Sequence, residues 1–174
     1  VLLLDRMTNL VEEGLDLALR IGPMQDTALE TIEVGRVRRM VVASPSYLQA
    51  RGVPERPQDL ARHRIAVSVG ASASLDWSFG DEAHPQNVRV VPALSVSSLR
   101  AAIGEARAGW ALTRVMSYQV KDDLAAGRLR AVLEAFEPPP LPVCLMFPRS
   151  RIPSARLMAF VELASRRLEA ALRA

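Results

Sequence analysis

The stretch VASPSYLQARGVPERPQDLARHR, residues 42–64, carries the clearest folding signals in this chain. Its Ser44 can cap the free amides of a helix, and Pro45 suits the first helical position, where its missing N–H costs nothing. Gly52 provides a fitting end for that helix. The chain then enters RIAVSV, which predicts a strand at 64–69. A helix that leads directly into a buried strand indicates an α/β arrangement.

Outward from this stretch, predicted strands and helices alternate along the chain. The segment LDLALRI alternates apolar and polar residues, which is the period of a strand. Strands are predicted at 1–4, 15–21, 34–43, 64–69, 110–115, 128–133 and 143–147, with a hairpin-like excursion within 76–96. Helices are predicted from Thr8–Asn9 to Gly14, at 57–63, from Ser97 to Gly109, from Met116 to Gly127, and from Ser154 onward. We therefore expect an α/β fold with mostly parallel strands.

Composition and charge bound the class of protein. The 174 residues suffice for one domain or two small lobes, and 49% of them are hydrophobic, as in ordinary globular proteins. A single cysteine, Cys144, and two histidines argue against a disulfide framework and a structural zinc site. No apolar run is long enough to span a membrane, so we expect a cytoplasmic protein. The 22 basic and 19 acidic residues give a net charge of +3, without the aromatic and basic surface that nucleic-acid binding needs.

No motif indicates catalysis. The chain lacks GxGxxG, GxxxxGK[ST] and GxSxG, which excludes the common phosphate loops and the hydrolase nucleophile elbow. Neighbours such as Asp122 and Asp123 point in different directions on a helix, so both are expected on the solvated surface. His63 and His84 are expected in surface or packing roles, and Cys144 in the core. We expect no catalytic residue, no metal site and no cofactor.

Small hydroxyl residues recur where predicted strands meet helices. They are Thr8, Ser44, Ser68, Ser97, Ser98 and Thr113. Ligands of open α/β sheets bind beyond the carboxyl ends of strands, where the first amides of helices are unpaired. Each hydroxyl taken alone fits an ordinary helix cap. Their recurrence also fits a shared binding site.

Several longer segments, taken together, resemble one known family. They are NLVEEGLDLALRIG (9–22), VASPSYLQARGVPERPQDLARHR (42–64), LDWSF (75–79), DDLAAGRLRAVL (122–133) and PPPLPVCLMFPRSRIPSARLMAFVELASRRL (138–168). In this order they resemble the effector-binding domain of LysR-type transcriptional regulators. The likeness is greatest to the branch with an ASPxYL segment, which stands at 43–48 here.

The resemblance implies a two-lobed fold like that of type II periplasmic binding proteins. Residues 1–42 and 148–174 would form the first lobe and 43–147 the second, with chain crossings near 42–44 and 143–147. A small-molecule effector, anionic or aromatic, would bind in the cleft between the lobes. The residues implied for that site are Asp5, Arg6, Thr8, Ser44, Ser68, Val69, Gly70, Ser97, Ser98 and Thr113.

Two departures from the family pattern affect these expectations. The family's winged helix-turn-helix domain, linker helix, and opening strand and helix of the effector domain are not in the sequence, so we expect an N-terminally incomplete domain. In addition, ARAGWALTRV stands where relatives often have GLGIALLP, so Trp110 and Arg114 are expected to reshape the effector site.

The resemblance also implies partners. These are a small-molecule effector, further copies in a homodimer or homotetramer, and DNA only through the absent N-terminal domain, with no membrane contact. Two other functions stay open at this point. One is a transporter-type solute-binding protein of the same fold, and the other is an enzyme such as a prephenate dehydratase-like domain.

Overall fold

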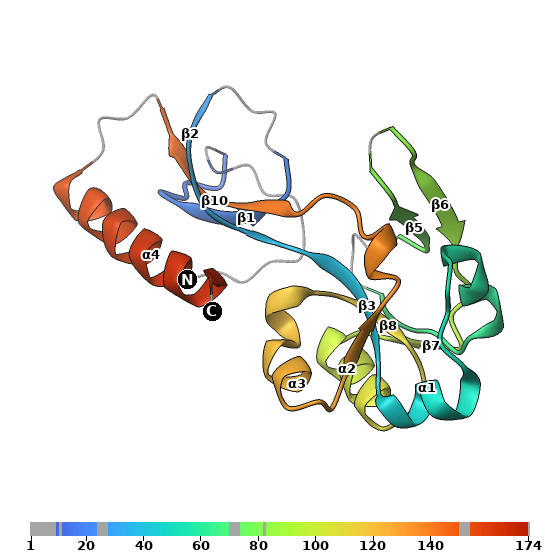
Figure 1. The fold of residues 1–174 in the computed structure, drawn as a ribbon. Helices are drawn as coiled ribbons and strands as arrows, with labels where there is room; N and C mark the ends of the chain where they lie inside the picture. Colours follow the sequence, from blue (N-terminus) through green and yellow to red (C-terminus); the bar gives the residue numbers. More distant parts are fainter. Residues whose placement is uncertain are drawn as a thin grey trace. The chain divides into compact units, whose positions relative to one another are not determined.

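The computed structural model describes residues 10, 12–23, 28–69, 74–81, 83–149 and 154–173. The chain folds into two compact units (Figure 1), of which unit 1 comprises residues 1–37 and 140–174, and unit 2 comprises 38–139. The structure divides the chain after residues 37 and 139, whereas the lobe boundaries were expected after residues 42 and 147. The strand predicted at 1–4 and the helix start predicted at Thr8–Asn9 lie outside the described residues. The described part of that predicted helix, up to Gly14, is a turn.

Unit 1 is built on a three-stranded sheet with a helix. The strands lie in the order β1 (Ala18–Ile21), β10 (Leu141–Pro148) and β2 (Leu29–Val37), and both pairings are antiparallel. The long helix α4 (Ala155–Arg173) packs on β2 and buries Val161. Its amide at Leu157 donates to the Ser154 hydroxyl at 3.2 Å, which confirms the predicted cap. Cys144 is buried, as predicted.

Unit 2 is built around β3 (Arg39–Ala43), which lies between β8 (Thr113–Met116) and β9 (Arg130–Val132). A parallel pair, β4 (Ala66–Ser68) with β7 (Leu94–Val96), joins this sheet through a parallel bridge between Ile65 and Leu112. The strands β5 (Asp76–Phe79) and β6 (Gln86–Arg89) form an antiparallel hairpin. The helices are α1 (Pro45–Arg51), α2 (Leu99–Arg107) and α3 (Lys121–Ala125), with short 3-10 turns η1 (Pro57–Arg62), η2 (Ser117–Gln119) and η3 (Glu134–Phe136).

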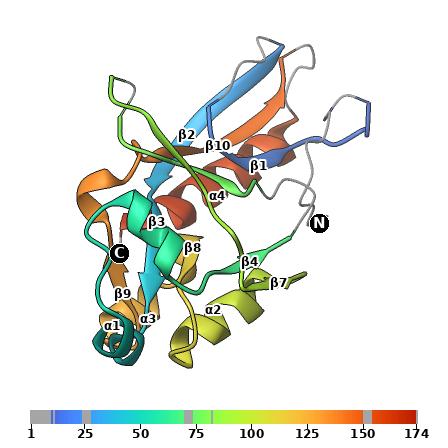
Figure 2. The ribbon, with the colours of Figure 1, turned by 90° about the vertical axis from the view of Figure 1, so that its right-hand side faces the viewer.

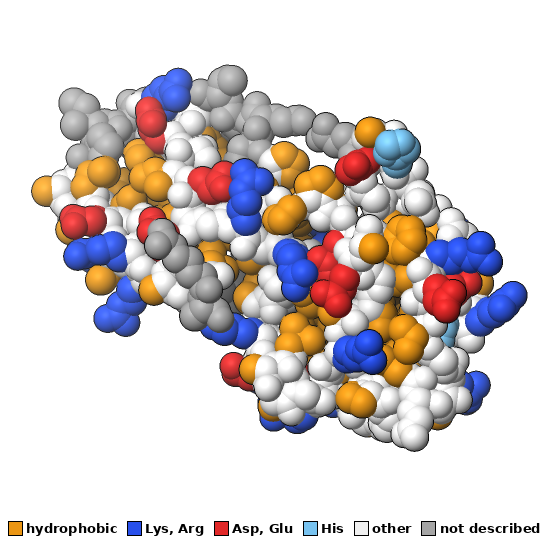
Figure 3. All heavy atoms as spheres, viewed as in Figure 1, with side chains coloured by type: hydrophobic (Ala, Val, Ile, Leu, Met, Phe, Trp, Pro, Cys, Tyr) orange, Lys and Arg blue, Asp and Glu red, His pale blue; other side chains and the backbone are white. Residues whose placement is uncertain are grey.

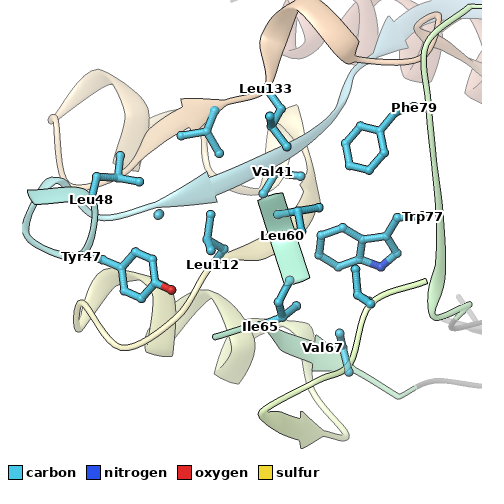
Figure 4. Packing of buried hydrophobic residues seen from close by; sticks show 13 residues of the cluster. Val41, Tyr47, Leu48, Leu60, Ile65, Val67, Trp77, Phe79, Leu112 and Leu133 are labelled. Carbon is cyan, nitrogen blue, oxygen red and sulfur yellow. The ribbon is translucent and has the colours of Figure 1, made fainter. Parts of the chain in front are cut away.

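The central strand β3 is buried on both faces because side chains alternate along a strand. Met40 and Val42 pack with Ile103 of α2. Val41 faces the other way, into a cluster that contains Trp77 and Phe79 of the hairpin (Figure 4). In Figure 2, α2 lies beside β4 and β7, in agreement with its contacts to both strands. This explains why the sequence of β3, RMVVA, is apolar almost throughout rather than alternating.

Some sequence-based expectations were wrong in detail. The single strand predicted at 34–43 is two strands, β2 and β3, which belong to different sheets and separate at Arg38. The helix predicted from Met116 to Gly127 is the turn η2 followed by the short α3. Among the described pairings only β4–β7 and the Ile65–Leu112 bridge are parallel, so the expectation of mostly parallel strands is corrected. Apolar patterning determines which side chains are buried but carries no signal of strand direction.

Candidate functional site

One edge of the sheet in unit 2 gathers several of the predicted site residues. Because β4 and β7 run parallel, with Ser68 opposite Val96, both strands end at this edge. Ser97 and Ser98 follow β7 directly and lead into α2. We call the group Ser68, Ser97 and Ser98 the serine edge. The amide of Val69, also predicted, donates to the Val96 carbonyl at 2.8 Å and extends the ladder to the same edge.

The hydroxyls of the serine edge are uncommitted within the described part of the chain. Ser98 is the N-cap residue of α2, yet its side chain makes no capping hydrogen bond. Ser97 and Ser98 are exposed and Ser68 is half-buried. The first-turn amides of α2 therefore lie beside hydroxyl groups that the helix itself does not use. Such a combination can bind an anion or a hydroxylated ligand.

Ser44 lies at the opposite edge of the sheet. It follows the carboxyl end of β3, whose direction is antiparallel to β8, and it is buried. Its hydroxyl accepts the Tyr47 amide at 3.2 Å, which confirms the predicted cap of α1, and it lies 3.0 Å from the Ser46 hydroxyl. The structure thus gives Ser44 a role in folding and separates it from the serine edge.

Thr113 also lies apart from the serine edge. It pairs with Val42 across β3 and β8, so it belongs to the face of the sheet that α2 and α3 cover. It is 1% exposed, and its hydroxyl has no hydrogen-bond partner among the described residues. The remaining predicted residues, Asp5, Arg6, Thr8 and Gly70, lie outside the described part of the chain.

Two arginines lie on the other face of the sheet, toward the same end of the strands as the serine edge. In the register of β3 and β8, Arg39 stands opposite Met116 and Val41 opposite Arg114. Opposed residues of an antiparallel pair share a face, so Arg39 and Arg114 are diagonal neighbours. Arg114 was expected to reshape the effector site from the sequence, whereas Arg39 was not. A detectable signal existed, because Arg39 shares the period-2 face of the buried Val41.

Arg114 is held over an aromatic ring. Its guanidinium carbon lies 4.7 Å from the ring centroid of Trp77, which is buried in the hairpin strand β5. Burial, followed by the charge of Arg39, lowers the pKa of the Arg114 guanidinium to about 10, so it stays cationic at neutral pH. Burial also lowers the pKa of Arg39. The Nη1 atom of Arg114 is buried, and none of the residues that the structure describes forms a hydrogen bond with it.

The adjacent Arg38 differs from these two arginines in being neutralised. Its Nη1 lies 3.4 Å from a carboxylate oxygen of Glu137 and 3.9 Å from one of Glu134. Burial raises the pKa of Glu137, while the charge of Arg38 opposes that rise. The described carboxylates nearest to the beginning of β3 are therefore committed to Arg38. Within the described residues, Arg39 and Arg114 have no carboxylate partner.

The expectation that Asp122 and Asp123 both lie on the solvated surface was wrong for Asp123. Its side chain is 2% exposed, and its Oδ1 accepts from Nε of Arg128 at 2.8 Å while Oδ2 accepts from Arg107. Burial alone would raise the pKa of Asp123, but the hydrogen bonds and charges of both arginines lower it below its ordinary value. This ion pair connects α2, α3 and the chain before β9, and it is structural.

The histidines have the packing and surface roles that the sequence indicated. The Tyr47 hydroxyl accepts the Arg64 amide at 2.9 Å and lies 3.2 Å from Nδ1 of His63. Burial lowers the pKa of His63. His84 is exposed near Asp81 in the turn between β5 and β6. Neither histidine lies at the serine edge.

Comparison with known proteins identifies the family. Residues 2–169 match the LysR substrate binding domain family. An uncharacterized HTH-type transcriptional regulator of Haemophilus influenzae is 27% identical over 147 residues, which are 84% of this chain and 51% of that protein. The HTH-type transcriptional regulator PtxR of Pseudomonas aeruginosa is 27% identical over 158 residues, 91% of this chain and 51% of that protein. The chain thus spans about half the length of these curated relatives.

Solved structures show the same fold. The LysR-type regulator CrgA of Neisseria meningitidis gives a TM-score of 0.77 at 24% identity, covering 92% of this chain and 54% of that one. The regulatory domain of AphB of Vibrio vulnificus gives 0.74 at 20% identity, covering 86% and 74%. Such regulatory domains have a two-lobed fold of the type II periplasmic-binding-protein kind. In the described part of the chain, no helix has the length and apolar character needed to cross a membrane. The chain belongs to the LysR substrate binding domain family.

Proposed function

We propose that this chain is the effector-binding domain of a bacterial LysR-type transcriptional regulator. In the whole protein, a small molecule bound here would modulate DNA binding by a helix-turn-helix domain outside this sequence. The family match over residues 2–169 and the HTH-type regulators among the relatives support this proposal. The same relatives favour a regulator over a transporter-type solute-binding protein or a dehydratase-like enzyme. We propose a sensing role without catalysis.

The serine edge is the observation that carries the proposal. Three hydroxyls come together where two parallel strands end and α2 begins, and the described chain uses none of them in a hydrogen bond. Open α/β sheets bind ligands at this kind of position, beyond the carboxyl ends of their strands. We propose that Ser68, Ser97 and Ser98 contact the effector and that Ser44 supports the fold.

We further propose that the protein is cytoplasmic and assembles as a homodimer or homotetramer. Exposed apolar side chains on α4 support self-association, because Met158, Phe160 and Leu163 are 42%, 56% and 48% exposed. Figure 3 shows apolar side chains among charged ones over this helix. DNA would be contacted through the helix-turn-helix part of the whole protein.

A thermal-shift screen of small carboxylates, phosphates and neutral aromatics on the 174-residue chain tests the proposal. A ligand that binds only the folded state raises the melting temperature as its concentration passes the Kd. We expect at least one compound class to give a saturable rise. A screen in which no small molecule raises the melting temperature would contradict an effector-binding role.

A further inference from the structure

Arg39 and Arg114 form a cationic pair that the described chain leaves uncompensated. They are diagonal neighbours on one face of β3 and β8, and the charge of Arg39 acts directly on Arg114. Two like charges that are partly withdrawn from water destabilise a fold unless something opposite in charge meets them. The neighbouring Arg38 shows the usual arrangement, with two glutamates close to it.

Trp77 fixes the orientation of Arg114 without using its hydrogen-bond donors. The guanidinium carbon lies over the indole ring, 4.7 Å from its centroid. A cation–π contact uses none of the N–H groups of a guanidinium, and these form a planar fork that matches an oxyanion. One donor atom of that fork, Nη1, is buried and has no hydrogen-bond partner among the described residues, which costs free energy.

The nearby carboxylates of the described chain do not supply that acceptor. Asp76 of β5, next to Trp77, pairs with Arg89 across the hairpin at 3.2 Å. Glu134 and Glu137 pair with Arg38. Asp76, Glu134 and Glu137 are thus paired with other arginines, and a bound anion could supply the acceptor for Arg114.

We propose that Arg39 and Arg114 together bind the oxyanion of a small organic effector, a carboxylate or a phosphate, beside the serine edge. This inference rests on the proposed effector-binding function and specifies the chemical class of the effector. The serine hydroxyls would form hydrogen bonds, as donors or acceptors, with the other polar groups of the same molecule. A guanidinium can bind either a carboxylate or a phosphate through two parallel hydrogen bonds. The experiment below tests compounds of both kinds.

The test uses the two tryptophans of the chain, Trp77 and Trp110. Trp110→Phe leaves Trp77 as the single fluorescent reporter, in contact with Arg114. In this background, calorimetry and fluorescence titrations are run with benzoate, succinate and glycerol 1-phosphate. Benzamide, succinamide and glycerol serve as the neutral counterparts. Each titration is repeated in Arg114→Gln, in Arg39→Gln, and in Arg114→Lys, which keeps the charge but loses the fork.

Arg64→Gln is the matched control. Arg64 also stacks on a tryptophan position, with its guanidinium carbon 5.3 Å from the Trp110 ring in the native chain. It precedes Ile65 at the start of the β4 ladder, so it lies at the edge opposite Ser68. This variant removes one arginine charge from unit 2 without touching the proposed site.

We expect at least one anion to bind with a Kd in the millimolar range or lower and to change Trp77 fluorescence. Its affinity should exceed that of its neutral counterpart. Arg114→Gln and Arg39→Gln should each lower the affinity for that anion by about 10- to 100-fold, the range for hydrogen bonds to a charged group. Arg64→Gln should leave the affinity for that anion unchanged. If Arg114→Gln does not fold, Arg39→Gln and Arg114→Lys decide the question.

Two outcomes would overturn the inference. One is that none of the three anions binds. The other is that an anion binds with the same affinity in the native chain and in both arginine variants. If a neutral compound from the thermal-shift screen binds while every anion fails, the effector-binding function stands and this inference alone is wrong. If nothing in either experiment binds, both proposals are contradicted.

Discussion

The guanidinium of Arg114 lies over the ring of Trp77, with 4.7 Å between the guanidinium carbon and the ring centroid. Arg64 and Trp110 form a second such pair, at 5.3 Å, at the opposite edge of the same sheet. The pairs differ in their surroundings. Trp77 is buried, and Arg114 has a buried donor without a partner. Arg64 is exposed, so water can satisfy its donors. Within the described part of the chain, the first pair therefore contains a buried donor without an acceptor, and it lies toward the end of the sheet that carries the serine edge.

Replacing both Ser97 and Ser98 by alanine should weaken effector binding by about 1–3 kcal/mol, the cost of losing hydrogen bonds to a charged or polar group. The fold should persist, because Ser98 makes no capping hydrogen bond to lose. Calorimetry with a compound found in the screen measures the change. Ser44→Ala is the contrasting variant: it should destabilise α1 by about 1 kcal/mol and leave the intrinsic affinity of the folded protein unchanged. Equal affinity in wild type and the double variant would move the site elsewhere.

Asp123→Asn should lower the free energy of unfolding by about 2 kcal/mol at neutral pH, because it removes a buried acceptor shared by Arg107 and Arg128. The exposed neighbour offers the control, and Asp122→Asn should change stability by less than about 0.5 kcal/mol. Urea unfolding followed by circular dichroism measures both. Equal stability of the two variants would show that the buried ion pair does not stabilise the fold.

The same variant predicts a dependence on pH. The arginines hold the pKa of native Asp123 below its ordinary value. Its stabilisation is therefore complete above the ordinary carboxyl pKa of about 4 and is lost as the pH falls through the lower native pKa. The difference between wild type and Asp123→Asn should shrink under acid conditions. A difference that stays constant from neutral pH to about pH 2 would contradict this assignment.

The sequence predicted the elements whose signals are local. The cap of α1 by Ser44, the turn at 57–63 and the cap of α4 by Ser154 are all present, because each depends on side chains and amides a few residues apart. The family resemblance led to the fold. Strand direction and the division of 34–43 into two sheets depend on contacts between distant segments, which local patterns do not encode.

The site was predictable only in part for the same reason. Ser97 and Ser98 adjoin each other in sequence, and Ser68 joins them only through the pairing of β4 with β7. Ser44 has the same chemistry as these serines, and only the register of β3 shows that it lies at the other edge. The local sequence predicts a surface position for Asp123, and only the fold brings Arg107 of α2 to it.

In solution the chain should form a dimer or a larger species. The exposed apolar side chains of α4 favour association, and side-by-side pairing is expected from the family. Light scattering coupled to size exclusion, at micromolar protein concentration, measures the mass. A sharp peak at the monomer mass of 19.0 kDa across the concentration range would count against this expectation.

The isolated chain should not bind an operator selectively. Specific DNA binding requires an element that enters a groove and enough cationic contacts to displace counterions. Here the net charge is only +3, and the arginines at the beginning of β3 are divided between glutamate pairing and the proposed effector site. Gel-shift titration against the promoter of the regulator's own gene, at physiological salt, measures this. A saturable, sequence-selective shift would refute the purely sensory role.

The central claim is that the serine edge of unit 2 holds the effector, and amide chemical-shift mapping tests it most directly. A 15N-labelled chain is titrated with the tightest compound from the screen. The largest shifts should occur at Ser68, Val69, Ser97 and Ser98, with Arg114 following them along the same binding curve. Shifts centred instead on Ser44 and Gly109 at the opposite edge, or on the groove beside Gly35 and Leu172 in unit 1, would contradict the account.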